Sequence, residues 1–479
     1  MVFSTSAWML GAALMAAQAQ APPPAQSPVA VQAPPENTQR PTGRTQRPST
    51  RQPSASGQGS VEQARTSRDG GPTRQELTFT ANLLAGYDDN LTAGLGSGSG
   101  TSPAAMVSGT TASVDGTLGY FRGNSLRSFQ LDTTGSLVGY PDNLENPAPA
   151  GSLNASGRTP MGRATTLGLS GRVSYQPLFS VLSPGAGTGP LPPGVAQPAP
   201  TTGLFERKSL SSSAGVSLDR RWGRRDTTTL GYTYRMQEFT DDDYGDSAWH
   251  DVAASYRRIA SSQVKAGADY RYRSGEYRDS QDLARPTVEH RVEGVTEFMG
   301  TPSRRRSYSI LLAAGVRYLE LVSASGATST SWLPVGRTRL TLDVSSNWSI
   351  EGGYQRELSL LQGVTDEVYT TDTASVTTKG MLSRRAALMI GATYSNWVTT
   401  VASGVRDTMD VYGATLGLRF LLTDSLAATA NYHYYLHRYS NPASLPAGFP
   451  AEFDRRGVRV GLSMFFPLAG STSRQVSRW

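Results

Sequence analysis

The chain has 479 residues, of which 38% are apolar and 50 are glycine, a composition that argues against several compact soluble cores. It contains no cysteine, which excludes disulfide bonds, thiolate metal sites and cysteine nucleophiles. The formal charge of +7 rests almost entirely on arginine. These arginines are scattered through turns, polar strand faces and the N-terminal region, without the basic helix or aromatic platform of a nucleic-acid-binding protein, so we expect no nucleic-acid partner.

The first 19 residues are typical of a signal peptide. Trp8 to Met15 form a short apolar stretch, and Ala17-Gln18-Ala19 is a small-residue cleavage site. We expect cleavage after Ala19 or after Ala21, although no Lys or Arg precedes the apolar stretch. No later run of about 18 apolar residues follows, so the sequence offers no transmembrane helix.

Residues 20–75 are rich in Pro, Gln, Ser, Thr, Gly and Arg and too poor in apolar side chains to pack. We expect a disordered periplasmic linker. The spaced Arg40, Arg44, Arg47 and Arg51 leave open a second interpretation, in which a cationic arm contacts an anionic periplasmic partner such as the cell wall or an export component. Spaced charges with proline favour the linker.

From residue 76 to residue 467 the apolar residues fall on alternate positions in short segments, beginning with Leu77–Tyr87 and recurring in stretches such as Leu230–Met236 and Leu426–Tyr434. Successive side chains of a strand point to opposite faces, so each segment has one apolar and one polar face. A closed sheet with lipid outside and water inside requires this pattern. We therefore expect an all-β fold, a transmembrane antiparallel up-and-down β-barrel.

The number of strands follows from the connections. Barrels of bacterial outer membranes have an even strand number, short periplasmic turns and longer outer loops. The obvious strands alone would place the Pro-rich connection 177–207 on the short-turn side. One further strand near residues 150–156, turning at 157–162, moves it to the loop side and gives about 18 strands, with 16 as the alternative. Tight turns are expected at 123–125, 223–225, 259–262, 300–303, 344–347, 383–385 and 423–425.

Aromatic residues support this orientation, because barrels carry aromatic belts at both membrane interfaces. Those expected beside the turns are Tyr120, Trp222, Tyr256, Phe298, Trp348 and Phe420, and those expected near the loops are Phe239, Tyr272, Trp332 and Tyr394.

The polar face of the strands predicts a charged, mildly cationic lumen. The pore-lining candidates are Arg235, Arg257, Lys265, Asp269, Arg271, Arg273, Glu289, Arg291, Glu293, Arg337, Arg339 and Glu351; Arg317, Glu357 and Arg459 fall on the same face. A pore with this lining would favour small polar, anionic or sugar-like solutes. Alternatively, many of these charges pair across neighbouring strands and hold their register, and both statements can be true.

The last segment, Arg459-Val460-Gly461-Leu462-Ser463-Met464-Phe465-Phe466, resembles the closing strand of bacterial outer-membrane barrels, with Arg459, Gly461, Met464 and Phe466 at the matching positions. Gly86-Tyr87-Asp88-Asp89-Asn90-Leu91 looks like the opening strand of a loosely defined group of β-barrel porins, some of which accompany exopolysaccharide export. The resemblance implies a Gram-negative outer-membrane protein surrounded by lipid and lipopolysaccharide and recognised by the barrel-assembly machinery. Residues 468–479 depart from it as a polar periplasmic tail.

The function expected is therefore an outer-membrane channel, a porin-like diffusion pore or an export-associated pore. A structural barrel plugged by its N-terminal arm is one alternative. An outer-membrane hydrolase is another, using His433, or His250 with Asp246 or Asp251. No motif joins these residues, so we expect no enzyme, no cofactor and no metal; the acidic loop 241–246 also lacks the spacing of a calcium-binding loop.

Overall fold

The structure is a computed structural model that describes residues 73–92, 107–124, 126–139, 148–176, 209–239, 246–278, 284–303, 305–322, 328–360, 368–399, 408–440 and 451–469. The expected signal peptide, nearly all of the expected linker, most of the expected tail and residues 241–245 of the acidic loop lie outside these ranges. In the part described, no helix has the length and apolar character needed to span a membrane.

The described residues form one sheet of eighteen antiparallel strands. The strands are β1 (Arg74–Thr92), β2 (Val107–Gly123), β3 (Ser128–Gly139), β4 (Ala148–Pro160), β5 (Thr165–Gln176), β6 (Ser209–Arg221), β7 (Asp226–Phe239), β8 (Ser247–Ile259), β9 (Val264–Arg278), β10 (Ala284–Ser303), β11 (Arg306–Val322), β12 (Thr328–Ser345), β13 (Trp348–Leu360), β14 (Val368–Met381), β15 (Ala386–Thr399), β16 (Thr408–Leu421), β17 (Leu426–Tyr439) and β18 (Glu452–Ala469).

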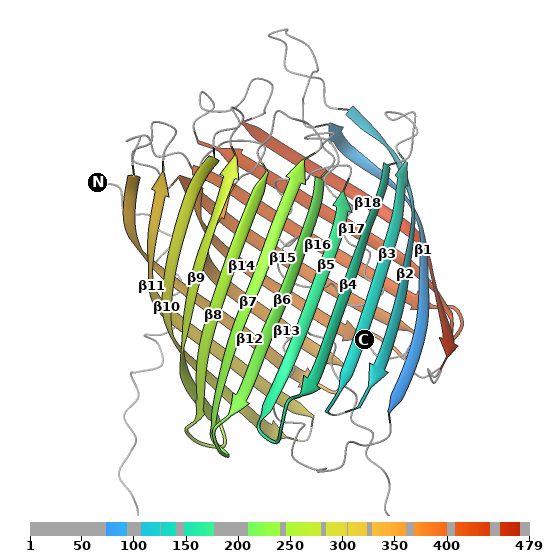
Figure 1. Ribbon diagram of the computed structural model, residues 1–479. Helices are drawn as coiled ribbons and strands as arrows, with labels where there is room; N and C mark the ends of the chain where they lie inside the picture. Colours follow the sequence, from blue (N-terminus) through green and yellow to red (C-terminus); the bar gives the residue numbers. More distant parts are fainter. Residues whose placement is uncertain are drawn as a thin grey trace, which may run out of the picture. The chain divides into compact units, whose positions relative to one another are not determined.

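The sheet closes on itself through its first and last strands. β1 pairs with β2 on one side, where Leu83 lies opposite Val114, and with β18 on the other, where Leu83 lies opposite Leu462. Figure 1 shows the strands following one another around the wall in chain order, with β1 in blue and β18 in red. Closure leaves no unpaired sheet edge, which is the condition for a sheet to span lipid. The predicted barrel of 18 strands, rather than 16, is confirmed.

The strand expected near residues 150–156 exists as β4, although its local sequence is weak. It pairs with β3 from Ala148 to Arg158 and with β5 from Gly151 to Pro160, so its neighbours stabilise it. Those pairings carry the strand to Pro160, through the first part of the expected turn at 157–162, and the chain reverses slightly later, at residues 161–164. β1 is likewise longer than expected, because its pairing with β2 continues beyond Tyr87.

The apolar rows face outward. Large apolar side chains such as Leu83, Val292 and Trp332 are exposed, whereas residues of the opposite strand face, among them Glu289 and Arg317, are buried. Only the enclosed side of a barrel can bury such residues, so the exposed face is the lipid-facing one. Phe239 lies at the loop end of β7, as expected, but it does not join the outer aromatic belt: it is buried and follows the polar row of β7, because it lies an odd number of positions from outward-facing Leu230.

Candidate functional site: charged clusters of the lumen wall

All twelve pore-lining candidates occupy the strand face opposite the exposed apolar rows, because the two-residue period of a strand is preserved along each segment. The structure draws several of them together on β8 to β12. We call the ten residues of this group the wall network: Arg257, Arg271, Arg273, Arg291, Arg317 and Arg337 with Asp251, Asp269, Glu289 and Glu293.

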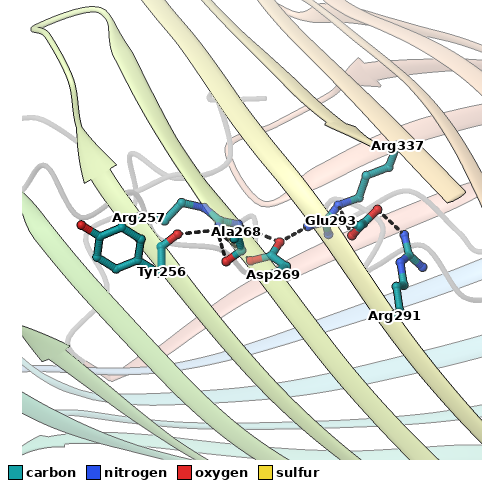
Figure 2. Close-up of polar contacts among 7 residues, drawn as sticks. All are labelled: Tyr256, Arg257, Ala268, Asp269, Arg291, Glu293 and Arg337. Atoms are coloured by element: carbon teal, nitrogen blue, oxygen red, sulfur yellow. Dashed lines mark hydrogen bonds and ion pairs between the residues drawn. The ribbon is translucent and has the colours of Figure 1, made fainter. Parts of the chain in front are cut away.

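One half of the wall network is centred on Asp269 and Glu293, which lie opposite each other on β9 and β10. Arg337 reaches both carboxylates from β12, at 2.5 Å from Asp269 Oδ2 and 3.6 Å from Glu293 Oε2 (Figure 2). Arg257 of β8 lies 2.7 Å from Asp269 Oδ1, and Arg291 lies 2.7 Å from Glu293 Oε1. Each carboxylate therefore has two arginine partners, so neither charge is left uncompensated in the wall.

The other half is built around Asp251 and Glu289, both almost completely buried. Arg271 binds Asp251 at 2.6 Å, and Arg273 lies between the two carboxylates, 3.5 Å from Asp251 and 3.6 Å from Glu289. Asp251 was missed as a lining residue, because its position next to His250 had suggested a catalytic pair. The alternation of β8 does place it on the lumen face, opposite Arg273 of β9.

Arg317 completes the wall network but differs from its other arginines. Its side chain is fully buried, and its nearest carboxylate oxygen is Glu289 Oε1, 4.0 Å away. None of its three guanidinium nitrogens donates a hydrogen bond to a described residue.

The remaining candidates lie outside the wall network. Lys265 pairs with Glu297 at 3.6 Å, nearer the turns, and Glu351 pairs with Lys379 of β14 at 3.4 Å. Arg235 of β7 is exposed and lies opposite Trp249 of β8. Arg339 is exposed on β12.

A second cluster joins the two ends of the barrel. Asp88 of β1 is fully buried; its Oδ2 lies 2.8 Å from Arg455 Nη2 and 3.6 Å from Arg459 Nη2, both on β18. His433 of β17 contacts Asp88 Oδ1 through Nε2 at 2.8 Å. We call these four residues the seam cluster, because they connect β1 to β18 and β17 where the sheet closes.

Two glycines make room for the seam cluster. A Cβ on Gly457 would collide with Asp88 Oδ1 and the His433 ring, and a Cβ on Gly86 would lie 2.7 Å from Arg459 Cγ. The first alternating segment expected from the sequence ends at Tyr87, one residue before Asp88, and neither Asp88 nor Arg455 is among the expected lining residues. The signal was present in the alternation, since Asp88 continues the row of Leu84, and Arg455 continues that of Arg459.

The closing-strand residues all lie on β18. Arg459 belongs to the seam cluster, and Gly461 allows β1 to approach, because a Cβ there would collide with the Leu83 carbonyl. Met464 lies opposite Ala81 of β1, and Phe466 stacks on Phe79 with 6.1 Å between ring centroids. Recognition of these residues by the assembly machinery stays a prediction.

The dyads suggested for a hydrolase do not form. His250 lies on the outer face, where its Nδ1 is 2.8 Å from the Tyr232 hydroxyl, whereas Asp251 points to the opposite face and binds Arg271. Asp246 instead accepts a hydrogen bond from the Phe239 amide. Among the described residues, no group of three or more His, Asp or Glu side chains is arranged to hold a metal ion.

No protein family and no curated protein matches the sequence. Among solved structures, the chain is similar to the outer membrane protein OpdK of Pseudomonas aeruginosa, at 9% identity and a TM-score of 0.42 over 82% of this chain and 99% of that one. It is also similar to OpdQ of the same organism, at 10% identity and 0.41 over 82% and 98%. A third similar structure is the FrpB iron transporter of Neisseria meningitidis, at 9% identity and 0.44 over 83% of each chain. The closed eighteen-stranded barrel with its apolar exterior is that of a bacterial outer-membrane protein.

Proposed function

We propose that the barrel is a diffusion channel for small polar solutes that prefers anionic ones. The observation that carries the proposal is the wall network, in which six arginines and four carboxylates face the lumen on neighbouring strands. A barrel of this strand number is wide enough to hold water, and an excess of fixed positive charge in its wall raises the local concentration of anions.

Many of the charges pair across strands, so the register-holding role expected as an alternative is compatible with this proposal. Ion pairs in the wall hold the arginines in fixed positions, and the excess positive charge acts on solutes. Arg235 provides a further fixed positive charge at the lumen surface, because it is exposed and no described carboxylate forms an ion pair with it.

Planar-bilayer recordings on the full-length protein test the proposal. In a salt gradient, we expect steady conductance steps and a reversal potential of the sign for anion preference. Arg235→Gln should move that potential toward zero, while Arg456→Gln should not, because Arg456 lies over Tyr434 on the outer face. The absence of conductance would overturn the channel, and a cation-selective wild type would overturn the anion preference.

A pore for sugar-like solutes associated with polysaccharide export is the second candidate, and Trp249 favours it. This ring is on the lumen side, opposite Arg235 and with the Arg273 guanidinium 5.9 Å from its centroid. A flat aromatic surface beside hydrogen-bond donors suits a sugar ring. Neutral glucose oligomers should then interrupt the current in a concentration-dependent way, and Trp249→Ala should weaken this block. Equal block of both proteins would contradict a role for Trp249.

A further inference from the structure

Three arginines of the wall network form a row across adjacent strands. Arg271 of β9 lies opposite Arg291 of β10, which lies opposite Arg317 of β11. Like charges directly opposite each other destabilise a sheet unless other groups compensate them. Arg271 and Arg291 have compensation, because Asp251 lies 2.6 Å from the first and Glu293 lies 2.7 Å from the second.

Arg317, at the end of this arginine row, lacks comparable compensation. It is fully buried without a hydrogen-bonded acceptor among the described residues, and Glu289, at 4.0 Å, also serves Arg273. A buried charge without a close partner costs several kcal/mol. The planar guanidinium offers five N–H donors in a fork whose spacing matches the oxygens of a carboxylate, phosphate or sulfate.

The charge of the wall network indicates the valence of such a ligand. Six arginines face four carboxylates, which leaves two positive charges in excess. Arg235 and Glu357 both interact electrostatically with Arg271 and carry opposite charges, so together they leave this balance unchanged. Glu357 also acts on Arg317, from β13. A doubly charged anion would neutralise the excess, whereas a singly charged one would leave half of it.

The arginine row also leads from water into the wall. The exposed fraction of the side chain falls from 34% at Arg271 to 11% at Arg291 and to zero at Arg317. Beside Arg317, Leu319 and Val335 are buried. Such apolar neighbours lower the local dielectric and strengthen the attraction between Arg317 and an anion.

We propose that Arg271, Arg291 and Arg317 form a binding site for a small dianionic oxyanion, of the class of phosphate, sulfate, phosphate esters and short dicarboxylates. The inference rests on the proposed channel, because the lumen is the route to the site. It names the preferred solute class and the residues that select it.

Equilibrium binding to the purified full-length protein in detergent tests the site. The probes are orthophosphate, sulfate and succinate, with nitrate and acetate as monovalent controls at matched ionic strength. We expect at least one dianion to bind about tenfold more tightly than either monovalent anion, a difference of about 1.4 kcal/mol. Equal affinities, or no binding of any dianion at millimolar concentration, would overturn the proposal.

Variants connect the binding to Arg317. Arg317→Met should weaken binding of the preferred dianion about tenfold or more, because it removes the donor fork. Arg317→Lys keeps the charge and should recover only part of the affinity, which provides a second measurement if the methionine variant does not fold. Arg456→Met, on the outer face, should bind like the wild type. Wild-type affinity in both Arg317 variants would overturn the assignment.

The binding and conductance measurements distinguish a wrong assignment of the dianion site from a wrong assignment of the channel. Steady anion-selective conductance without dianion binding refutes the site and retains the channel. Dianion binding that depends on Arg317 without any conductance retains the site and refutes the channel.

Discussion

The two charged clusters of the lumen wall both combine arginines with carboxylates, and they differ in how closely the most buried charge of each cluster is contacted by its partners. In the seam cluster, one buried carboxylate, Asp88, is surrounded by Arg455, Arg459 and His433, with its closest contacts at 2.8 Å. In the wall network, Arg317 forms no hydrogen bond with a described residue, and the carboxylate oxygen with which it pairs lies 4.0 Å away. The comparison teaches that arginine content alone does not mark a binding surface; what matters is whether the donors are already used.

The position of each cluster agrees with this distinction. The seam cluster connects strands from the two ends of the chain, since Asp88 and Arg455 are 367 positions apart in the sequence, and the pairing of these strands closes the sheet. The wall network lies on β8 to β12, which follow one another in the chain and pair in that order. We therefore assign the seam cluster to stability, whereas the wall network is the proposed contact for solutes.

The largest effect on the free energy of unfolding is expected for Asp88→Asn. This change keeps the size of the side chain but leaves the buried Arg455 without its counter-charge, which should lower the free energy of unfolding by about 3–5 kcal/mol. The measurement is the temperature at which the compact band on gels converts to the unfolded one. Asp89→Asn is the matched control, because Asp89 contacts the Arg456 amide at an exposed site. Similar shifts in both variants would show that Asp88 has no special role.

A somewhat smaller effect is expected for Gly457→Ala. The new methyl group would collide with Asp88 and the His433 ring, so the seam cluster would have to shift, at a cost of about 1–3 kcal/mol. Gly231→Ala is the control, because the nearest atom to its Cβ is the Val216 carbonyl oxygen at 3.9 Å. Equal stability of the two variants, measured by urea unfolding, would mean that the packing around Asp88 is loose.

The sequence predicted the barrel, its strand number and the strand face of the twelve candidate lining residues, because these follow from a two-residue period and from loop parity. Asp88, Asp251 and Arg455 were not among those candidates. β4 shows the strength of parity, since its own residues barely alternate. The alternation of apolar and polar residues does not determine the register between neighbouring strands. Whether Arg271, Arg291 and Arg317 lie level, or whether Asp88 meets Arg455, depends on how far each strand is shifted along its neighbour.

Unlike the two seam-cluster variants, Arg317→Met is not expected to lower the free energy of unfolding. Because Glu289 keeps Arg273 as a partner, removal of the guanidinium takes away a buried charge that lacks a close acceptor. In urea unfolding, with only monovalent anions in the buffer, the free energy of unfolding of the variant should therefore equal that of the wild type or exceed it by about 1 kcal/mol. Arg455→Met, the equivalent change in the seam cluster, should lower stability under the same conditions. A loss of stability in both variants would remove the difference on which the comparison depends.

The smallest effect is expected for Arg438→Ala, on the outer face of the same strands that carry the seam cluster. Arg438 Nε lies 3.1 Å from Glu452 Oε1, so the ion pair is as short as several in the barrel wall, but both side chains are about 60% exposed. The pair lies where β17 ends and β18 begins, at the rim of the barrel rather than against lipid, so water screens it. Both side chains also lose rotamer freedom on forming it, so its removal should cost less than about 0.5 kcal/mol. Urea unfolding of this variant beside Asp88→Asn separates burial from contact distance. If Arg438→Ala were as destabilising as Asp88→Asn, burial would not determine how much an ion pair contributes to stability in this barrel. The inference drawn from the buried, poorly paired Arg317 would then fail as well.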